Sequence, residues 1–169
     1  MIKKISIIVT FGSLFLFVLL FSVYISKEPN LGRLESISQV LRSEDGSIIN
    51  LRLTPSGHWR EKASLENVDA KLIDMLVAYE DKRFMSHFGV DPLALVRATY
   101  NSLASGRVVS GASTLTMQTV RLMHPELQQR TFKAKLMQML EAVRLERHLT
   151  KEEILEAYFS LAPYGGNIE

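Results

Sequence analysis

The first part of the chain constrains the fold most, because residues 5–25 form an almost uninterrupted run of aliphatic residues and phenylalanine without a single charge. A helix of about 20 apolar residues is long enough to span a bilayer. Lys3 and Lys4 precede the run, and the positive-inside rule places such residues in the cytoplasm. The sequence therefore predicts a cytoplasmic tail at residues 1–4 and a single-pass transmembrane anchor at residues 5–26 in the cytoplasmic (inner) membrane. The rest of the chain is expected on the periplasmic or extracytoplasmic side.

A cleaved signal peptide is the alternative interpretation of this segment. The apolar run is longer than the hydrophobic region of a usual signal peptide, and residues 22–26 lack an Ala-x-Ala-like cleavage site. Both observations favour an anchor that is retained.

Charge and composition narrow the range of partners. The 169 residues carry 20 Lys and Arg against 18 Asp and Glu, and Lys3 and Lys4 alone account for the net charge of +2. The remainder is neutral, so no nucleic-acid partner is indicated. The absence of cysteine excludes a disulfide framework, a thiolate metal site and a thiol nucleophile.

After the predicted anchor, the chain is expected to form a linker and then a small β element. Residues 27–34 contain Pro, Asn and Gly, which is typical of a linker. Within residues 35–66, two runs with alternating apolar residues, 38–42 and 47–53, flank an Asp-Gly pair. This pattern predicts a β-hairpin.

Helical periodicity replaces this pattern from Val68 onward, so residues 67–169 are predicted to be helical and the fold class mostly α. The first helix is expected to end near residues 84–89 and to pack through Leu72, Met75, Leu76 and Tyr79. Later helices are predicted from their start signals, which are Asp91-Pro92, residues 111–114, Thr131 and the Thr150/Glu153 capping box. The helix after Thr131 is expected to bury Leu136, Met139, Leu140 and Val143.

Positive charge gathers in the middle of this helical region. Between residues 92 and 140, six basic residues stand against Glu126 alone, whereas residues 27–91 and 141–169 are acidic. The basic residues are Arg97, Arg107, Arg121, Arg130, Lys133 and Lys135. Because Arg and Lys form charge-assisted hydrogen bonds with phosphate oxygens, this band suits an anionic ligand. Solvated helix faces are the alternative.

Residues 80–89 contain the first candidate for chemistry. Glu80 lies at a predicted helix end beside apolar residues, an environment in which a carboxylate can act as a base near neutral pH. The alternative is an ordinary helix C-terminus, with Glu80 paired to Arg83 and His87 bonded to a carbonyl of the last turn. No second His lies at ligand spacing from His87, so no metal site is predicted.

Residues 111–118 contain the second candidate. Small residues followed by Ser113 and Thr114 at a helix start form a cradle for an anion, because free backbone amides and hydroxyls point the same way. The Gly-Lys-Ser/Thr ending of a Walker loop is missing. An ordinary capped helix is the alternative.

In this order, the two segments resemble the peptidoglycan glycosyltransferase domain of class A penicillin-binding proteins and of monofunctional glycosyltransferases. Residues 80–89 fit the first motif of the family, Glu-Asp-x-x-Phe-x-x-His-x-Gly, at every fixed position. Residues 111–118 follow the second, Gly-Gly-Ser-Thr-Ile-Thr-Gln-Gln, with Ala112, Leu115 and Met117 as departures. Met117 and residues 57–60, Gly-His-Trp-Arg, are most similar to the penicillin-binding protein 1C branch.

The later motifs are matched less completely. In the third, Arg-Lys-x-x-Glu, this chain keeps Lys135 but has Ala134 and Gln138 at the outer positions; Lys133 and Glu141 are the nearby charged residues that could partly substitute. Residues 151–158 fit the fourth, Lys-x-x-Ile-Leu-Glu-x-Tyr. The fifth begins at residues 164–166 and is cut at the last residue, so the domain is expected to be incomplete at its C-terminus.

The resemblance implies a lysozyme-like helical glycosyltransferase domain that polymerises lipid II into glycan strands with inversion and releases undecaprenyl pyrophosphate. Glu80 is then the catalytic base, and Gln138 marks a degenerate second acidic position. The implied substrate-binding residues are Asp81, Phe84, His87, Ser113, Thr114, Gln118, Arg121, Arg130 and Lys135. No cofactor is required by the sequence, although a divalent cation, Mg²⁺ or Mn²⁺, assists some family members. The expected partners are lipid II, the growing glycan chain, membrane lipids and other cell-wall synthesis proteins.

Two other functions remain open from the sequence. A lysozyme-like peptidoglycan hydrolase would share the helical fold and the lone Glu, but it has no need for a cationic pyrophosphate site. A catalytically impaired, membrane-anchored fragment that binds a wall precursor is the second alternative, since the fifth motif is cut and no Ser-x-x-Lys nucleophile is present.

Overall fold

A computed structural model describes residues 2–106 and 111–169 of the chain, with side chains in the first helix described for residue 10 and from residue 12 onward. Arg107, a member of the predicted basic band, lies outside the described residues. The helices are α1 (Ile2–Ser26), α2 (Ala70–Glu80), α3 (Pro92–Ser105), α4 (Leu115–Met123), α5 (Phe132–His148) and α6 (Lys151–Leu161). Short 3₁₀ turns are η1 (Gly32–Glu35), η2 (Leu65–Asn67), η3 (Phe84–Ser86) and η4 (Pro125–Gln128). The mostly α fold is confirmed.

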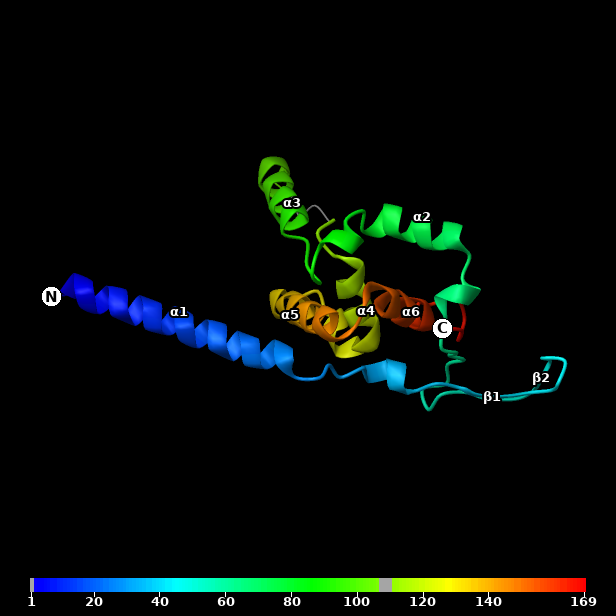
Figure 1. The fold of residues 1–169 in the computed structure, drawn as a ribbon. Coiled ribbons are helices and arrows are strands. Elements are labelled where there is room, and N and C mark those ends of the chain that lie inside the picture. Colours follow the sequence, from blue (N-terminus) through cyan, green and yellow to red (C-terminus); the bar gives the residue numbers. More distant parts are fainter. Residues whose placement is uncertain (1, 107–110) are drawn as a thin grey trace.

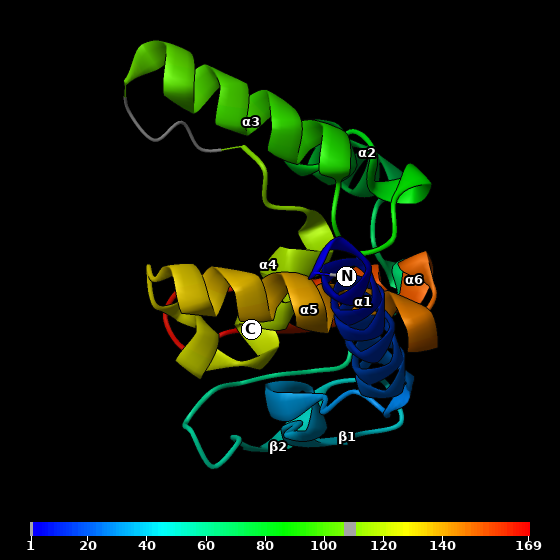
Figure 2. The same cartoon turned by 90° about the vertical axis from the view of Figure 1, so that its left-hand side faces the viewer.

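The predicted β element is a two-stranded antiparallel hairpin, formed by β1 (Gln39–Arg42) and β2 (Ile48–Arg52). The register shifts by one residue between Leu41 and Arg42, which pair with Asn50 and Ile48. Figures 1 and 2 show the hairpin on one side of the central helices, while α2 and α3 lie on the opposite side.

Helix α4 lies at the centre and packs against α5 and α6 (Figure 1). Burying apolar surface between helices is the main source of stability in such a core. The core residues are Phe84, Leu115, Met117, Val120, Met123, Ala142, Leu145, Ile154, Leu155 and Leu161. All of them follow residue 83, so this core holds the later part of the chain together.

Polar side chains begin the helices as the sequence predicts. Asp91 Oδ1 accepts hydrogen bonds from the amides of Leu93 and Ala94 at 2.9 and 3.1 Å. Thr131 and Thr150 cap α5 and α6, and Thr150 forms the full capping box. These caps satisfy amides that have no partner inside a helix.

Helix α2 differs from its prediction at the end and at the packed face. It ends at Glu80, before residues 84–89, because the backbone of Asp81 leaves the helical conformation at φ −156°. The core-facing residues are Ile73, Leu76 and Val77, whereas Leu72, Met75 and Tyr79 are exposed. Only Leu76 was placed correctly, because periodicity does not tell which of two overlapping apolar stripes meets the core.

The packed face of α5 is also shifted from its prediction. Its buried residues are Ala134, Gln138, Ala142 and Leu145. Of the predicted residues, Met139 is partly buried and packs against the core, whereas Leu136 is exposed. The small side chains of Ala134 and Ala142 let α5 approach its neighbours closely, while the larger Gln138 and Leu145 complete the inward face.

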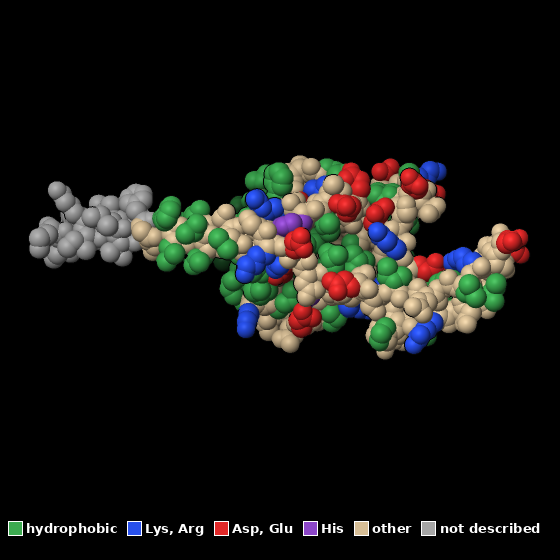
Figure 3. Space-filling view, turned by 60° about the horizontal axis from the view of Figure 1, so that its bottom comes forward, with side chains coloured by type: hydrophobic (Ala, Val, Ile, Leu, Met, Phe, Trp, Pro, Cys, Tyr) green, Lys and Arg blue, Asp and Glu red, His purple; other side chains and the backbone are tan. Residues whose placement is uncertain are grey.

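The predicted anchor forms one continuous helix, α1, and its apolar side chains at residues 14–20 and at Val23 are exposed (Figure 3). Within the part of the chain that the structure describes, no helix combines the length and the apolar character needed to cross a membrane. Residues 5–9 and Phe11 of the predicted anchor lie outside the described side chains. The tertiary contacts of α1 are made with α5.

Candidate active site

Glu80 occupies the last position of α2, and its carboxylate is exposed. The side-chain amide of Gln118 on α4 donates a hydrogen bond to Glu80 Oε2 at 2.9 Å. Glu80 of the first motif and Gln118 of the second lie 38 positions apart in the sequence, yet the fold brings their side chains into direct contact. A carboxylate at the surface and held by one amide can reach a substrate hydroxyl.

Asp81 turns inward where Glu80 turns outward. Its Oδ2 lies 2.9 Å from His87 Nε2 and accepts a hydrogen bond from the amide of Leu115 at 2.9 Å. In the described residues Arg83 does not pair with Glu80, since Arg83 Nε lies 3.5 Å from Asp91 Oδ2. The ordinary helix C-terminus considered from the sequence is therefore wrong for both Glu80 and His87.

The other fixed positions of this segment attach it to the core. Phe84, which was expected to bind substrate, is 0% exposed and meets the His87 ring edge-on at 6.2 Å between ring centres. The Phe84 side chain therefore anchors the loop at residues 81–89 to the core. Gly89 has φ +80°, and a Cβ there would lie 2.5 Å from the carbonyl oxygen of Ala142. Only glycine allows the loop to lie so close to α5.

The second segment combines a cap with a cation contact. Thr114 Oγ1 accepts from the amide of Met117 at 3.1 Å and donates to the carbonyl of Gly89 at 2.6 Å. Lys135 Nζ donates a hydrogen bond to Ser113 Oγ. Burial lowers the pKa of Lys135, and the nearby charge of Arg121 lowers it further. Lys135 is thus a partly desolvated cation without a carboxylate partner among the described residues.

A cavity of about 400 Å³ lies between α2, α3 and the segment before α4. Its lining carries three carboxylates, those of Glu80, Asp81 and Asp91, beside three cations, Lys82, Arg83 and Arg97. Ser113 and Thr114 line it as well. Arg97 belongs to the predicted basic band but was not selected as a site residue, because nothing local distinguishes it from a solvated cation.

Tyr158 on α6 is a further site residue that the sequence did not identify. Burial raises the pKa of its hydroxyl, the charge of Glu80 raises it further and the charge of Arg121 lowers it. The charges of Glu80 and Arg121 therefore both act on the Tyr158 hydroxyl. In the sequence Tyr158 is the last fixed position of the fourth motif and was not among the predicted site residues.

Arg121 and Arg130 are exposed, and neither forms an ion pair within the described part of the chain. Together with Lys135 they are named the open basic cluster. The contact between Lys135 and Ser113 connects this cluster to the second motif. No contact joins Arg130 to the other site residues among those described, so its binding role remains a prediction.

Gln138, at the degenerate second acidic position, has a structural contact in this chain. Gln138 is buried and donates its side-chain amide to the carbonyl of Leu127 at 2.6 Å. Glu141, the nearby acid considered as a substitute, accepts from Tyr24 and lies 3.3 Å from Arg144. Neither residue supplies a second carboxylate beside Glu80, and the described residues contain no group of three or more His, Asp or Glu that could hold a metal ion.

Two residues that the site prediction omitted complete a buried network. Lys151 Nζ donates to the carbonyl of His87 at 2.8 Å and to Glu146 at 2.7 Å. Glu146 also accepts from Thr116 Oγ1 on α4. We call Asp81, His87, Thr116, Glu146 and Lys151 the buried polar ring.

The candidate site thus combines a surface carboxylate, a cavity lined by both acidic and basic side chains, and a helical core that carries them. Residues 45–169 match the Transglycosylase family, and the chain belongs to that family. The sequence prediction of a glycosyltransferase is thereby confirmed at the level of the enzyme class.

Similar proteins agree with this assignment. Penicillin-binding protein 1C of Escherichia coli is 40% identical over 132 residues, which cover 78% of this chain and 17% of that protein. Penicillin-binding protein 1A of E. coli is 39% identical over 103 residues (60% of this chain, 12% of that protein), and that of Pseudomonas aeruginosa is 34% identical over 146 residues (80% and 17%). The predicted resemblance to class A penicillin-binding proteins is confirmed. The chain spans less than a fifth of the length of these relatives.

Proposed function

We propose that the chain is a peptidoglycan glycosyltransferase that polymerises lipid II, with Glu80 as its general base. One observation carries this proposal: Glu80 lines the cavity that Arg83 and Arg97 also line, and Gln118 holds its carboxylate at 2.9 Å. A base beside cations suits a reaction in which a hydroxyl loses a proton while a phosphate gains charge. The helical core supports a lysozyme-like arrangement of the domain.

The proposed reaction is a displacement with inversion. Glu80 takes the proton from the 4-hydroxyl of the acceptor lipid II, whose oxygen attacks the anomeric carbon of the growing chain. The bond from that carbon to the pyrophosphate oxygen breaks, and undecaprenyl pyrophosphate leaves with the bonding electron pair. In this proposal the open basic cluster stabilises the charge that develops there, with Ser113, Thr114 and Gln118 as hydrogen-bonding groups.

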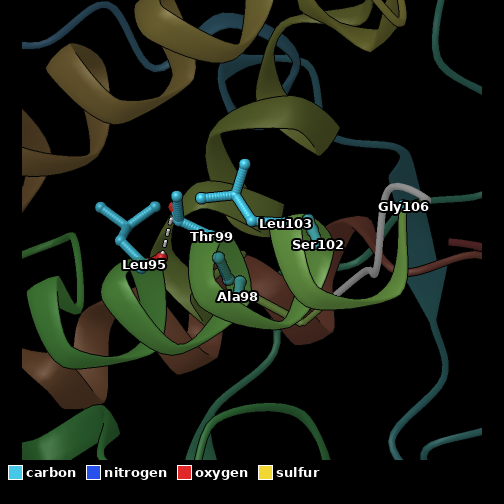
Figure 4. A pocket seen from close by; sticks show the side chains of 7 residues that line it. Leu95, Ala98, Thr99, Ser102, Leu103 and Gly106 are labelled. Carbon is cyan, nitrogen blue, oxygen red and sulfur yellow. Dashed lines mark hydrogen bonds between the residues drawn. The ribbon is translucent and has the colours of Figure 1, made fainter.

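A second pocket supports a substrate with a lipid portion. It has a volume of about 430 Å³, and Leu95, Ala98 and Leu103 of α3 give it a mainly apolar wall (Figure 4). Ala112 lines both this pocket and the polar cavity, so the two are neighbours. An amphiphile can occupy adjoining polar and apolar pockets at once.

The residues present do not fit a resident divalent cation. Asp81 is engaged by His87 and by the amide of Leu115, and Gln138 directs its amide to Leu127. Asp91, which also lines the cavity, caps α3 and lies 3.5 Å from Arg83, so Glu80 alone is left as a carboxylate ligand, whereas Mg²⁺ and Mn²⁺ prefer several oxygen ligands. We therefore assign the neutralisation of the pyrophosphate to Lys and Arg side chains, with no step that depends on a metal.

We further propose that α1 attaches the domain to the outer face of the cytoplasmic membrane. Exposed apolar side chains along α1, from Leu14 to Val23, support this location, as do Lys3 and Lys4 before them. Such a location brings the site to the lipid-linked substrate and to other cell-wall synthesis proteins. Partition of the full chain into liposomes, compared with that of a Leu16→Asp, Leu19→Asp variant, tests the attachment.

Incubation of the detergent-solubilised chain with labelled lipid II tests the function. Glycan strands are the expected product. Cleavage of finished peptidoglycan would instead support the lysozyme-like hydrolase. Binding of lipid II without turnover would support the impaired, precursor-binding fragment.

A further inference from the structure

We propose that Glu146 is a positioning residue for Glu80, acting through the buried polar ring; this rests on the function proposed above. Glu146 lies near the end of α5, and its side chain is 3% exposed. It does not line the cavity that contains Glu80. Its influence on the reaction must therefore pass through other residues.

The contacts of Glu146 join two parts of the site. Thr116 Oγ1 donates to it from α4, only two residues before Gln118. Lys151 Nζ lies 2.7 Å from Glu146 and also donates to the carbonyl of His87, at the end of the first motif. The carboxylate of Glu146 thus connects α4 with the loop that follows α2.

The remaining members close the ring beside Glu80. His87 Nε2 lies 2.9 Å from Asp81 Oδ2, and the same oxygen accepts the amide of Leu115, the residue before Thr116. Asp81 directly follows Glu80 in the chain. Two connections therefore set the place of Glu80: the backbone, held through Asp81, and the side chain, held by Gln118.

The second ring nitrogen of His87, Nδ1, supports the same positioning role for Glu146. His87 Nδ1 is buried without a hydrogen-bond partner in the described structure, and it lies 3.8 Å from Glu146 Oε1. Carboxylates thus face both nitrogens of this ring. Lys151 Nζ also lies 4.4 Å from the centre of the Phe84 ring, which fixes the lysine above the loop. A carboxylate at residue 146 is the one group that meets Thr116, Lys151 and His87 together.

The test compares Glu146→Gln with Glu141→Gln in the full chain. Both changes replace a partly or fully buried carboxylate of α5 by an amide, but Glu141 contacts Tyr24 and Arg144 and takes no part in the ring. A misplacement of about 1 Å can lower a rate on the order of 100-fold. We expect Glu146→Gln to lower kcat for lipid II polymerisation on the order of 100-fold with KM nearly unchanged. Glu141→Gln should leave both constants near those of the wild type.

Amide hydrogen exchange at Leu115 supplies a readout that is independent of turnover. We expect the protection of this amide to fall in Glu146→Gln while that of the α6 core is kept. A wild-type kcat together with unchanged protection at Leu115 would overturn the proposal. If the wild type forms no glycan strands, the proposed function fails, and the exchange comparison still decides whether Glu146 positions this segment.

A second pair of variants covers the case in which Glu146→Gln does not fold. Thr116→Val keeps the shape of the side chain and removes one donor to Glu146, whereas Thr116→Ser keeps the hydroxyl. We expect kcat to fall in the first and to be restored in the second. Equal kcat in the two folded variants would contradict a positioning role for this contact.

Discussion

The buried polar ring and the open basic cluster hold their charges in opposite ways. In the ring, Glu146 is 3% exposed and meets Lys151 at 2.7 Å. In the cluster, Arg121 and Arg130 are exposed and have no ion-pair partner among the described residues. Charges that are paired inside the protein fix geometry, whereas unpaired cations remain available for a ligand. The same residue types thus serve two purposes, which only their surroundings distinguish.

Breaking the ring should have the largest effect on stability. Lys151→Met removes the cation and leaves the buried Glu146 carboxylate with the hydroxyl of Thr116 as its donor. Removing one partner of a buried ion pair typically costs about 3–5 kcal/mol. Urea unfolding of the full chain in detergent measures this loss. Lys71→Met, at an exposed position of α2, is the matched control and should change stability by less than about 0.5 kcal/mol. Equal stability of the two variants would show that the ring contributes no structural constraint.

Removing a cation of the open basic cluster should affect binding and leave the fold intact. Lys135→Ala eliminates the contact with Ser113 and the charge that we propose for binding the leaving group. A hydrogen bond to a charged group contributes about 1.5–3 kcal/mol, so the affinity for lipid II should fall by roughly 10- to 100-fold. Fluorescence anisotropy with labelled lipid II measures it. Lys133→Ala, on the same helix and exposed, controls for overall charge; an equal loss there would refute a specific site.

The pH dependence of binding sharpens the comparison. Burial and then Arg121 lower the pKa of Lys135, so its charge is present at low pH and disappears at a lower pH than that of an ordinary lysine. Affinity for the pyrophosphate end should accordingly weaken as pH rises through this lowered pKa. Arg121→Gln removes one cause of the shift, and the remaining pH-dependent loss should move to higher pH. A loss at the same pH in both proteins would contradict this cause.

Asp91 should give the smallest effect, since it caps α3 at the rim of the cavity. Burial favours its neutral form, but the amides of Ala94 and Leu93 together with Arg83 lower its pKa. Its stabilising contribution is therefore complete above the pKa of an unfolded Asp and is lost as pH falls through the lowered value. Asp91→Ala should cost about 1 kcal/mol, and Asp91→Asn much less. Unfolding at neutral pH distinguishes the two variants.

The sequence predicted what is encoded locally. The caps at Asp91, Thr131 and Thr150 were correct, because each depends on a polar side chain and the next few amides. The proximity of Glu80 and Gln118 could be predicted only from the family motifs. Local spacing alone would have favoured an ordinary helix end.

Tertiary packing decided the features that the sequence did not predict. The exposed face of α2 depends on how that helix meets the core, which its own periodicity does not determine. Glu146 was not predicted as a site residue, but the end of α5 places it beside His87. Gln138 occupies the predicted second acidic position, but its side-chain amide donates to the carbonyl of Leu127 and not to the site. Contacts of this kind join residues from separate helices.

The central claim is that Glu80 is the base of a glycosyl transfer. Glu80→Gln keeps the size of the side chain but cannot accept the proton, so the polymer yield from labelled lipid II in a gel assay tests the claim directly. We predict no glycan strands from Glu80→Gln, with lipid II binding and membrane attachment retained. A polymer yield equal to that of the wild type would contradict the account.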